Sequence, residues 1–149
     1  MAKLAVILLV EDNRMDIELT LDAFREAHLV NKVQVVTTGE AALDYLLRRG
    51  VYTDASKSPL PDLILLDLNL PGLSGFEVLE QIKATPIIKR IPVVILSSSR
   101  EEGDRALSYD GGANSYLVKP VSFDGFLAVT NQIEGYWLSL NVGPPEVDL

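Results

Sequence analysis

The feature that most constrains the fold of this chain is a strict alternation between short apolar runs and amphipathic segments. The five apolar runs are Leu4–Val10, Lys32–Val36, Asp62–Leu68, Pro92–Leu96 and Ser115–Val118. Several of them are apolar at nearly every position, which is typical of parallel strands buried on both faces. Each run is followed by a segment with helical periodicity, so strands and helices are predicted to alternate along the whole chain.

The helical segments repeat apolar residues three or four positions apart, and four of the five follow a residue that caps helices well. The predicted caps are Asn13, Thr38, Ser74 and Ser122. Gly50 is predicted to end the second helix and Pro86 the third, while Gly103 weakens the fourth helix, Arg100–Asp110. Five strands alternating with five helices predict an α/β fold, a flavodoxin-like doubly wound (βα)5 architecture around a five-stranded parallel sheet.

The 149 residues are enough for one domain, which we place at residues 3–135. Residues 136–149 form a C-terminal extended tail in this interpretation. Within it Leu138, Leu140 and Val142 alternate with polar residues, which indicates a strand. Such a strand either folds back onto its own domain or pairs with another chain as a dimerisation arm, and both alternatives stay open.

Composition excludes several classes of function. The chain has no cysteine and one histidine, which excludes disulfides, thiolate metal sites and cysteine nucleophiles. The net charge of −8 argues against nucleic acid as a partner, because phosphate contacts need clustered Lys and Arg. No apolar run approaches the roughly 18 residues of a membrane span, and the N-terminus lacks a secretory cleavage site. We therefore expect a cytoplasmic protein with no membrane or nucleic-acid partner.

Polar residues that could bind a ligand or take part in a reaction follow four of the predicted strands. In strand order they are Glu11 and Asp12, then Asp67 and Asn69, then Ser97, then Lys119 and Pro120. Ligands of open parallel sheets bind at the carboxyl ends of the strands, so these side chains are expected to converge. Three neighbouring carboxylates repel one another, and a hard divalent cation such as Mg²⁺ removes that conflict.

The predicted cluster suits phosphoryl transfer. A carboxylate such as that of Asp67 can attack phosphorus and form an acyl phosphate. Glu11, Asp12 and the backbone carbonyl of Asn69 are candidate ligands that complete a Mg²⁺ site with Asp67. The Lys119 ammonium would neutralise phosphoryl oxygens, and the Ser97 hydroxyl would donate a hydrogen bond to one of them.

Four segments in the same order resemble the signature motifs of response-regulator receiver domains. They are Val10–Asn13, Leu66–Gly75, Val94–Ser97 and Tyr116–Pro120. The resemblance covers about Lys3–Gly135, and it is the conjunction of the four motifs that makes it specific. It implies a protein of a two-component phosphorelay that accepts a phosphoryl group from a sensor histidine kinase and is not itself an enzyme, beyond weak autophosphorylation and autodephosphorylation.

The resemblance also implies a role for individual residues. Asp67 is the phosphoacceptor, Glu11 and Asp12 are the acidic pair for Mg²⁺, Ser97 is the switch hydroxyl, Tyr116 is the aromatic switch and Lys119 faces the phosphate. Asn69 and Ser99 match positions that tune dephosphorylation. The Lys119–Pro120 peptide bond is expected to be cis, a geometry essentially confined to proline.

The tail, with Tyr136, Trp137 and Leu138, and the polar loop Val51–Pro61 resemble the small phytochrome-associated response regulators. This narrower resemblance implies a light-sensing histidine kinase as partner and a homodimer. The loop departs from the compact chemotaxis type of receiver.

Two other functions compete with an active receiver. The first is an interaction module of the same fold that signals without phosphorylation. Such modules often lack one of the four main functional residues, whereas this chain retains Asp12, Asp67, Ser97 and Lys119. The second is a hydrolase or phosphatase with an aspartate nucleophile. Enzymes of the haloacid-dehalogenase type need a second Asp two residues after the nucleophile. Asn69 occupies that position, so no general acid is available there.

Overall fold

A computed structural model describes residues 6–27, 32–98 and 101–133 of the chain. The strands are β1 (Val6–Val10), β2 (Lys32–Val36), β3 (Leu63–Leu66), β4 (Val93–Ser97) and β5 (Ser115–Val118). The helices are α1 (Arg14–Glu26), α2 (Gly39–Leu46), α3 (Gly75–Ala84), α4 (Glu102–Asp110) and α5 (Phe123–Gln132), with 3-10 turns at Gly50–Tyr52 and Ile88–Arg90. The five strands form one parallel sheet in the order β2-β1-β3-β4-β5, which confirms the flavodoxin-like prediction.

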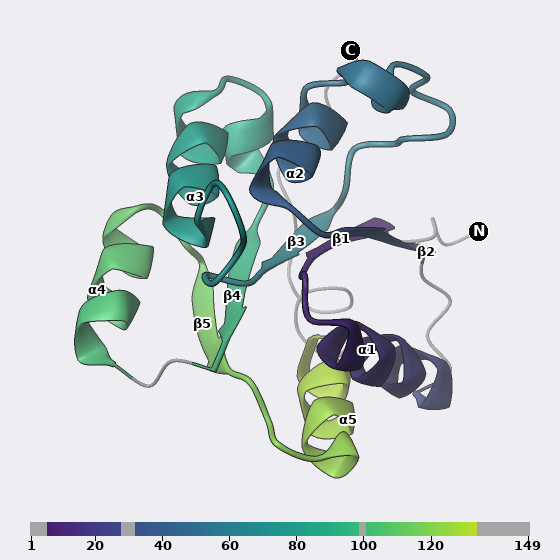
Figure 1. Ribbon diagram of the computed structural model, residues 1–149, viewed down its shortest axis with the longest axis vertical. Coiled ribbons are helices and arrows are strands. Elements are labelled where there is room, and N and C mark those ends of the chain that lie inside the picture. Colours follow the sequence, from purple (N-terminus) through teal and green to yellow (C-terminus); the bar gives the residue numbers. More distant parts are fainter. Residues whose placement is uncertain (1–5, 28–31, 99–100, 134–149) are drawn as a thin grey trace.

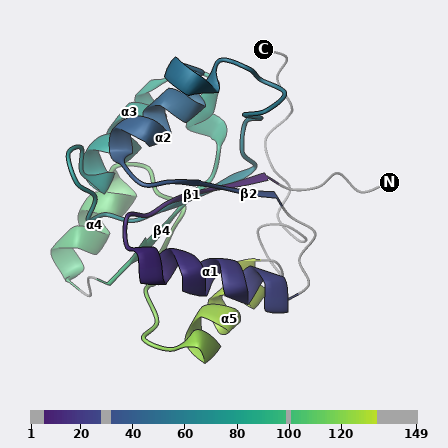
Figure 2. The same ribbon diagram turned by 45° about the vertical axis from the view of Figure 1, so that its right-hand side comes forward.

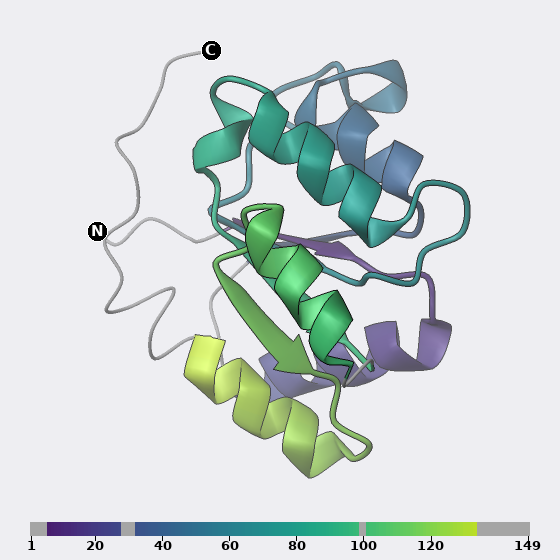
Figure 3. The same cartoon turned by 90° about the vertical axis from the view of Figure 1, so that its left-hand side faces the viewer.

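The sheet is the middle layer of three (Figures 1 and 2). Helices α1 and α5 pack together on one face, while α2, α3 and α4 cover the other. In Figure 3 the edge strand β5 lies between α4 and α5, which cover its two faces. Every residue of β1, β3 and β4 is buried, because these three inner strands are covered on both sides.

The four predicted helix caps are confirmed. The side chains of Asn13, Thr38, Ser74 and Ser122 each accept a hydrogen bond from a backbone N–H in the first turn of the helix that follows. Such caps satisfy donors that have no partner inside the helix. Three of these caps stand directly at the carboxyl end of the sheet, so they also fix where the helices leave the strand ends.

The end of α2 differs from the prediction. The helix ends at Leu46, four residues before Gly50, and Arg48 adopts the left-handed conformation with φ 56°. The backbone N–H of Arg49 then donates to Asp44 O and that of Arg48 to Tyr45 O, the two bonds of a Schellman motif. The hydrogen bonds that close the last turn therefore outweigh the intrinsic preference of glycine for this position.

Tyr45 ties α2 to the loop that leads into β3. Its hydroxyl donates to Pro59 O at 2.7 Å, and burial raises the pKa of Tyr45 to about 12. We expect Tyr45→Phe to lower the unfolding free energy at neutral pH by about 1 kcal/mol, the usual value of one hydrogen bond. An unfolded tyrosine ionises near pH 10, whereas the folded one keeps its proton longer. Wild-type stability should therefore fall between pH 10 and 12, and the fall should be smaller in Tyr45→Phe. Urea unfolding at pH 8 and pH 11 tests both statements.

A strained turn precedes β4. Ile87 has φ 77° and ψ −63°, and the N–H of Ile88 donates to Pro86 O at 3.0 Å, which closes a three-residue γ-turn. This turn is rare, and a β-branched residue in it is strained. The turn lies before the amino end of β4, whereas the predicted site lies at the carboxyl ends of the strands.

Several predictions fall outside the described residues. These are the tail 136–149, Ser99, and the first two residues of the first predicted strand, Leu4 and Ala5. The proposed dimerisation arm therefore stays a prediction. Among the helices that the structure describes, none combines the length and apolar character that crossing a bilayer requires.

Candidate phosphoryl-transfer and metal site

The candidate site forms where β1 and β3 end side by side. The N–H of Asp67 donates to Val10 O, and the N–H of Glu11 donates to Val36 O, each at 3.0 Å. These two bonds continue the parallel ladder one residue past the strands. The acids are consequently held by the sheet itself, and their side chains are brought together as the sequence predicts.

The three predicted acids form one cluster. Ligand oxygens of Glu11, Asp12 and Asp67 all lie within 4.8 Å of one another. Glu11 and Asp67 are only 2% and 5% exposed, whereas Asp12 is exposed. Two desolvated carboxylates next to a third are unfavourable unless cations balance them.

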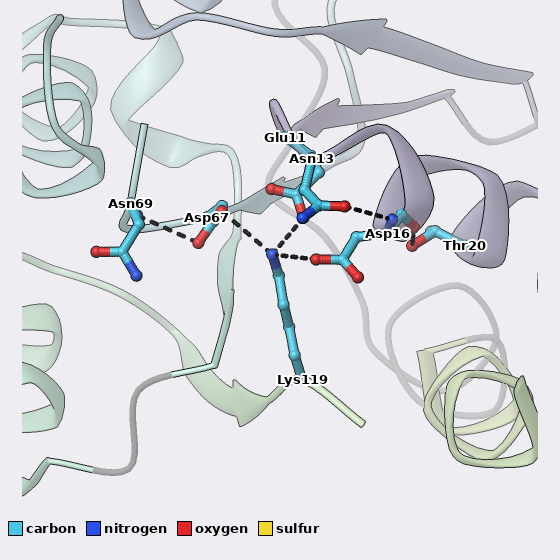
Figure 4. Close-up of polar contacts among 7 residues, drawn as sticks. All are labelled: Glu11, Asn13, Asp16, Thr20, Asp67, Asn69 and Lys119. Atoms are coloured by element: carbon cyan, nitrogen blue, oxygen red, sulfur yellow. Dashed lines mark hydrogen bonds and ion pairs between the residues drawn. The ribbon is translucent and has the colours of Figure 1, made fainter. Parts of the chain in front are cut away.

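Lys119 supplies one such cation. Its Nζ reaches across from the end of β5 and contacts Glu11 Oε1, Asp16 Oδ2 at 2.9 Å and Asp67 Oδ2 at 3.2 Å (Figure 4). The Lys119 side chain is only 10% exposed. A largely buried ammonium with three carboxylate partners is strongly attracted to this end of the sheet.

Glu11 and Lys119 both have a raised pKa in this cluster. Burial raises the pKa of Glu11 to about 9. The neighbouring Asp67 carboxyl group also raises this pKa, and its effect is larger than the lowering caused by Lys119. Burial on its own would lower the pKa of Lys119, but hydrogen bonds to Glu11 and Asp16 and the charge of Asp67 raise it above its usual value. One lysine therefore does not balance the acids completely.

The loop after β3 is fixed by several polar contacts. The N–H of Asn69 donates to Asp67 Oδ1 at 3.2 Å, while the Asn69 side chain is exposed. Further along, Glu40 at the start of α2 accepts a hydrogen bond from the N–H of Leu73 at 3.0 Å. Gly72 has φ 71°, and a Cβ there would lie 2.6 Å from Glu40 Oε1. Glu40 and Gly72 thus shape the loop that presents Asn69.

Ser97 and Tyr116 lie on neighbouring strands beside the cluster. Ser97 is fully buried as the last residue of β4, and its carbonyl accepts the N–H of Lys119 at 2.7 Å. Tyr116 is half-buried on β5 and borders a pocket of about 190 Å³ together with Glu101, Arg105 and Val118. Their switch roles stay predictions, but their positions at one edge agree with the expected arrangement.

The expected cis bond before Pro120 is wrong for this structure. The described residues contain no cis peptide bond, so the Lys119–Pro120 bond is trans. Proline lowers the preference for trans without removing it. Lys119 reaches its three carboxylate partners with the bond in this form.

Asp16 and Glu40 are site residues that the strand-end reasoning missed. Both lie in the first turn of a helix rather than at the end of a strand. The signal available in the sequence is the capping pattern, since each acid follows its cap by two or three residues. Side chains in a helix point back toward its N-terminus, which here means toward the ends of the strands.

The cluster fits a divalent metal ion. Glu11 Oε2 is buried and has no hydrogen-bond partner within the described residues. An unpaired buried carboxylate oxygen is costly, and coordination to a cation would remove that cost. All the candidate ligands are oxygens, the donor type that hard cations prefer.

Residues 7–131 match the family described as the response regulator receiver domain. The chain belongs to the response-regulator receiver family. The match begins at the second residue of β1 and ends near the end of α5, so it contains the four motifs and confirms the resemblance noted in the sequence.

Two curated regulatory proteins are similar to this receiver along most of their length. It is 40% identical over 139 residues to the probable methanogenesis regulatory protein FilR2 of Methanothrix harundinacea, covering 93% of this chain and 87% of that protein. It is 41% identical over 133 residues to response regulator Rcp1 of Synechocystis, covering 89% and 88%.

Solved structures agree with the sequence relationships. The phosphorylated cyanobacterial phytochrome response regulator RcpA has a TM-score of 0.89 and 42% identity, with 96% of this chain and 100% of that chain covered. The Mn²⁺-bound form of Rcp1 has a TM-score of 0.84 and 39% identity, with 95% and 99% covered. This receiver is thus a relative of small phytochrome-associated response regulators.

Proposed function

We propose that this receiver accepts a phosphoryl group on Asp67 from a sensor histidine kinase and acts as a response regulator of a two-component phosphorelay. The observation that supports this most directly is the convergence of Glu11, Asp12 and Asp67 within 4.8 Å, with Lys119 Nζ 3.2 Å from Asp67 Oδ2. Phosphoryl transfer depends mainly on positioning and charge neutralisation, and this arrangement provides both.

In the transfer, an Asp67 carboxylate oxygen attacks phosphorus while the P–N bond to the kinase histidine breaks. The imidazole nitrogen leaves with the bonding electron pair and takes up a proton from solvent. Asn69 N–H and Lys119 orient the two Asp67 oxygens, and Lys119 neutralises charge on the phosphoryl oxygens. Water later attacks phosphorus, which releases inorganic phosphate and restores the carboxylate.

Mg²⁺ is the proposed cation of the site. Glu11, Asp12 and Asp67 would hold it, with the backbone carbonyl of Asn69 as a further ligand. When bound, Mg²⁺ neutralises phosphoryl charge and favours oxygen ligands in an octahedral shell. The protein contributes two buried carboxylates held by the sheet, those of Glu11 and Asp67. The third carboxylate, that of Asp12, is exposed to solvent.

Partner and assembly are proposals of the same kind. The relatives Rcp1 and RcpA support a phytochrome-type histidine kinase as the phosphodonor. We also propose that the protein forms a homodimer through the tail, residues 136–149. We propose a phosphoacceptor protein in the cytoplasm, with no nucleic-acid partner, and not an enzyme in its own right.

The test is labelling with acetyl phosphate and Mg²⁺, followed by intact mass immediately after quenching. Wild type should gain one phosphoryl group, and Asp67→Asn should gain none, because the amide cannot act as the nucleophile. Asp54→Asn, which changes an exposed loop aspartate, is the matched control and should label like wild type. Labelling that persists in Asp67→Asn would mean that another residue is the acceptor.

The competing function is an interaction module that does not need phosphorylation. It predicts no labelling of wild type and no change in intrinsic fluorescence when Mg²⁺ and beryllium fluoride are added together. The retained set of Asp12, Asp67, Ser97 and Lys119 favours the phosphoacceptor.

A further inference from the structure

Lys119 has one carboxylate partner that lies outside the metal-binding group of Glu11, Asp12 and Asp67. An ammonium has three N–H donors, and the Lys119 Nζ is surrounded by three carboxylates, those of Glu11, Asp16 and Asp67. Glu11 and Asp67 belong to the group that can hold a cation, whereas Asp16 does not. Asp16 is therefore the one partner that Lys119 does not share with the proposed metal.

Lys119 and a divalent cation compete for the same oxygens. Both are attracted to the carboxylates of Glu11 and Asp67, and they repel each other at short range in a partly desolvated site. A cation can bind well only if the ammonium gives up part of its contact with these two acids. An anion elsewhere within reach of Nζ would make that shift less costly.

Asp16 has the geometry of such an anion. Its carboxylate already lies 2.9 Å from Nζ, on the side of Lys119 away from Asp67 (Figure 4). The first turn of α1 holds it in place, because Asn13 accepts the N–H of Asp16 at 3.0 Å and Thr20 donates to its carbonyl at 2.7 Å. The Asp16 side chain is 24% exposed and that of Glu11 is 3% exposed, so Asp16 is the more hydrated of the two partners.

We propose that Asp16 is a positioning residue that retains the Lys119 ammonium when a divalent cation occupies Glu11, Asp12 and Asp67. This inference rests on the proposed function of the site and adds the means by which one lysine and one metal share it. Asp16 keeps one Nζ donor engaged at a fixed point, and the other two donors become available for Asp67 and its phosphoryl group. The residue thus acts through Lys119 and not as a metal ligand.

The test is a double-mutant cycle on binding of Mn²⁺ alone to the full chain, measured from the electron paramagnetic resonance signal of the free ion. The four proteins are wild type, Asp16→Asn, Lys119→Met and the double variant. We expect Asp16→Asn to weaken Mn²⁺ binding about tenfold when Lys119 is present, a usual size for coupled neighbours. In the Lys119→Met background the same substitution should have a clearly smaller effect, because no ammonium has to be moved.

Two controls separate positioning from charge and from folding. Asp22→Asn removes one negative charge from the same helix two turns away, where Asp22 pairs with Arg25, and it should change Mn²⁺ affinity little. Asp16→Glu keeps the carboxylate and should bind Mn²⁺ more tightly than Asp16→Asn. Circular dichroism confirms that each variant is folded before it is titrated.

The outcomes are distinct. A larger loss with Lys119 present than without it supports the proposal. Equal losses in both backgrounds, or no loss in either, overturn it, because Asp16 would then act only through its charge or not at all. If wild type itself fails to bind Mn²⁺, the proposed metal site is wrong and this inference falls with it, whereas binding by wild type with equal losses overturns the inference alone.

Discussion

Gly75→Ala should cost the protein both stability and metal binding, although Gly75 carries no functional group. Gly75 is the first residue of α3, and its N–H donates to Leu68 O at 2.9 Å. A Cβ at this position would lie 2.3 Å from Asp67 O and 2.5 Å from Leu68 Cα. Both are backbone atoms, which cannot rotate away as a flexible side chain could. The start of α3 or the chain after β3 must therefore move.

We expect the unfolding free energy to fall by about 1–3 kcal/mol or more, the usual cost of overpacking. Mn²⁺ affinity should fall about tenfold or more as well, since displacements of about 1 Å at a site have effects of that size. Urea unfolding and Mn²⁺ titration measure the two losses. Gly103→Ala is the matched control, because nothing lies within 4 Å of its added methyl group. Because alanine favours a helix more than glycine does, Gly103→Ala in α4 should raise the free energy of unfolding by about 0.5–1 kcal/mol. A Gly75→Ala protein as stable as wild type would contradict the close approach of α3 to Asp67.

Lys119→Met should separate metal binding from chemistry. Removing the ammonium takes away the cation that competes for Glu11 and Asp67, so Mn²⁺ should bind several-fold more tightly than to wild type. The same change removes the side chain that neutralises phosphoryl oxygens. We expect the rate constant for labelling by acetyl phosphate to fall about 10²-fold, as when one donor to a developing charge is lost.

The measurement is a time course of phosphoryl incorporation at saturating Mg²⁺, alongside Mn²⁺ titration. Lys83→Met is the control, since Lys83 is also partly buried but donates to the carbonyls of Lys89 and Ile91, away from the acid cluster. It should label at the wild-type rate. Parallel loss of Mn²⁺ binding and labelling in Lys119→Met would mean that Lys119 supports the cluster and does not compete with the metal.

The fold could be predicted from the sequence because its strongest signals are local. The inner strands are buried on both faces, so their apolar runs are continuous and their positions are clear. Asn13, Thr38, Ser74 and Ser122 are polar residues just before helical patterns, and the capping bond is made within three residues. The clustering of Glu11, Asp12, Asp67 and Lys119 follows from topology, because parallel strands end at one edge.

The parts that were not predicted depend on contacts between distant segments. Nothing local to Asp16 indicates that Lys119, 103 residues later, lies within 2.9 Å of its carboxylate. The left-handed conformation of Arg48 is likewise set by how the last turn of α2 closes, although glycine is the residue usually found there. The cis expectation for Pro120 came from the family resemblance alone, and the structure has the trans bond.

The γ-turn at Ile87 gives the two ends of the sheet separate roles. Strained backbone is often found at active sites, where it belongs to the mechanism. Here the strained residue precedes the amino end of β4. Asp67 and Lys119 follow the carboxyl ends of β3 and β5, at the other end of the sheet. We therefore expect substitutions that relieve the strain at Ile87 to change the free energy of unfolding more than the geometry of the acid cluster.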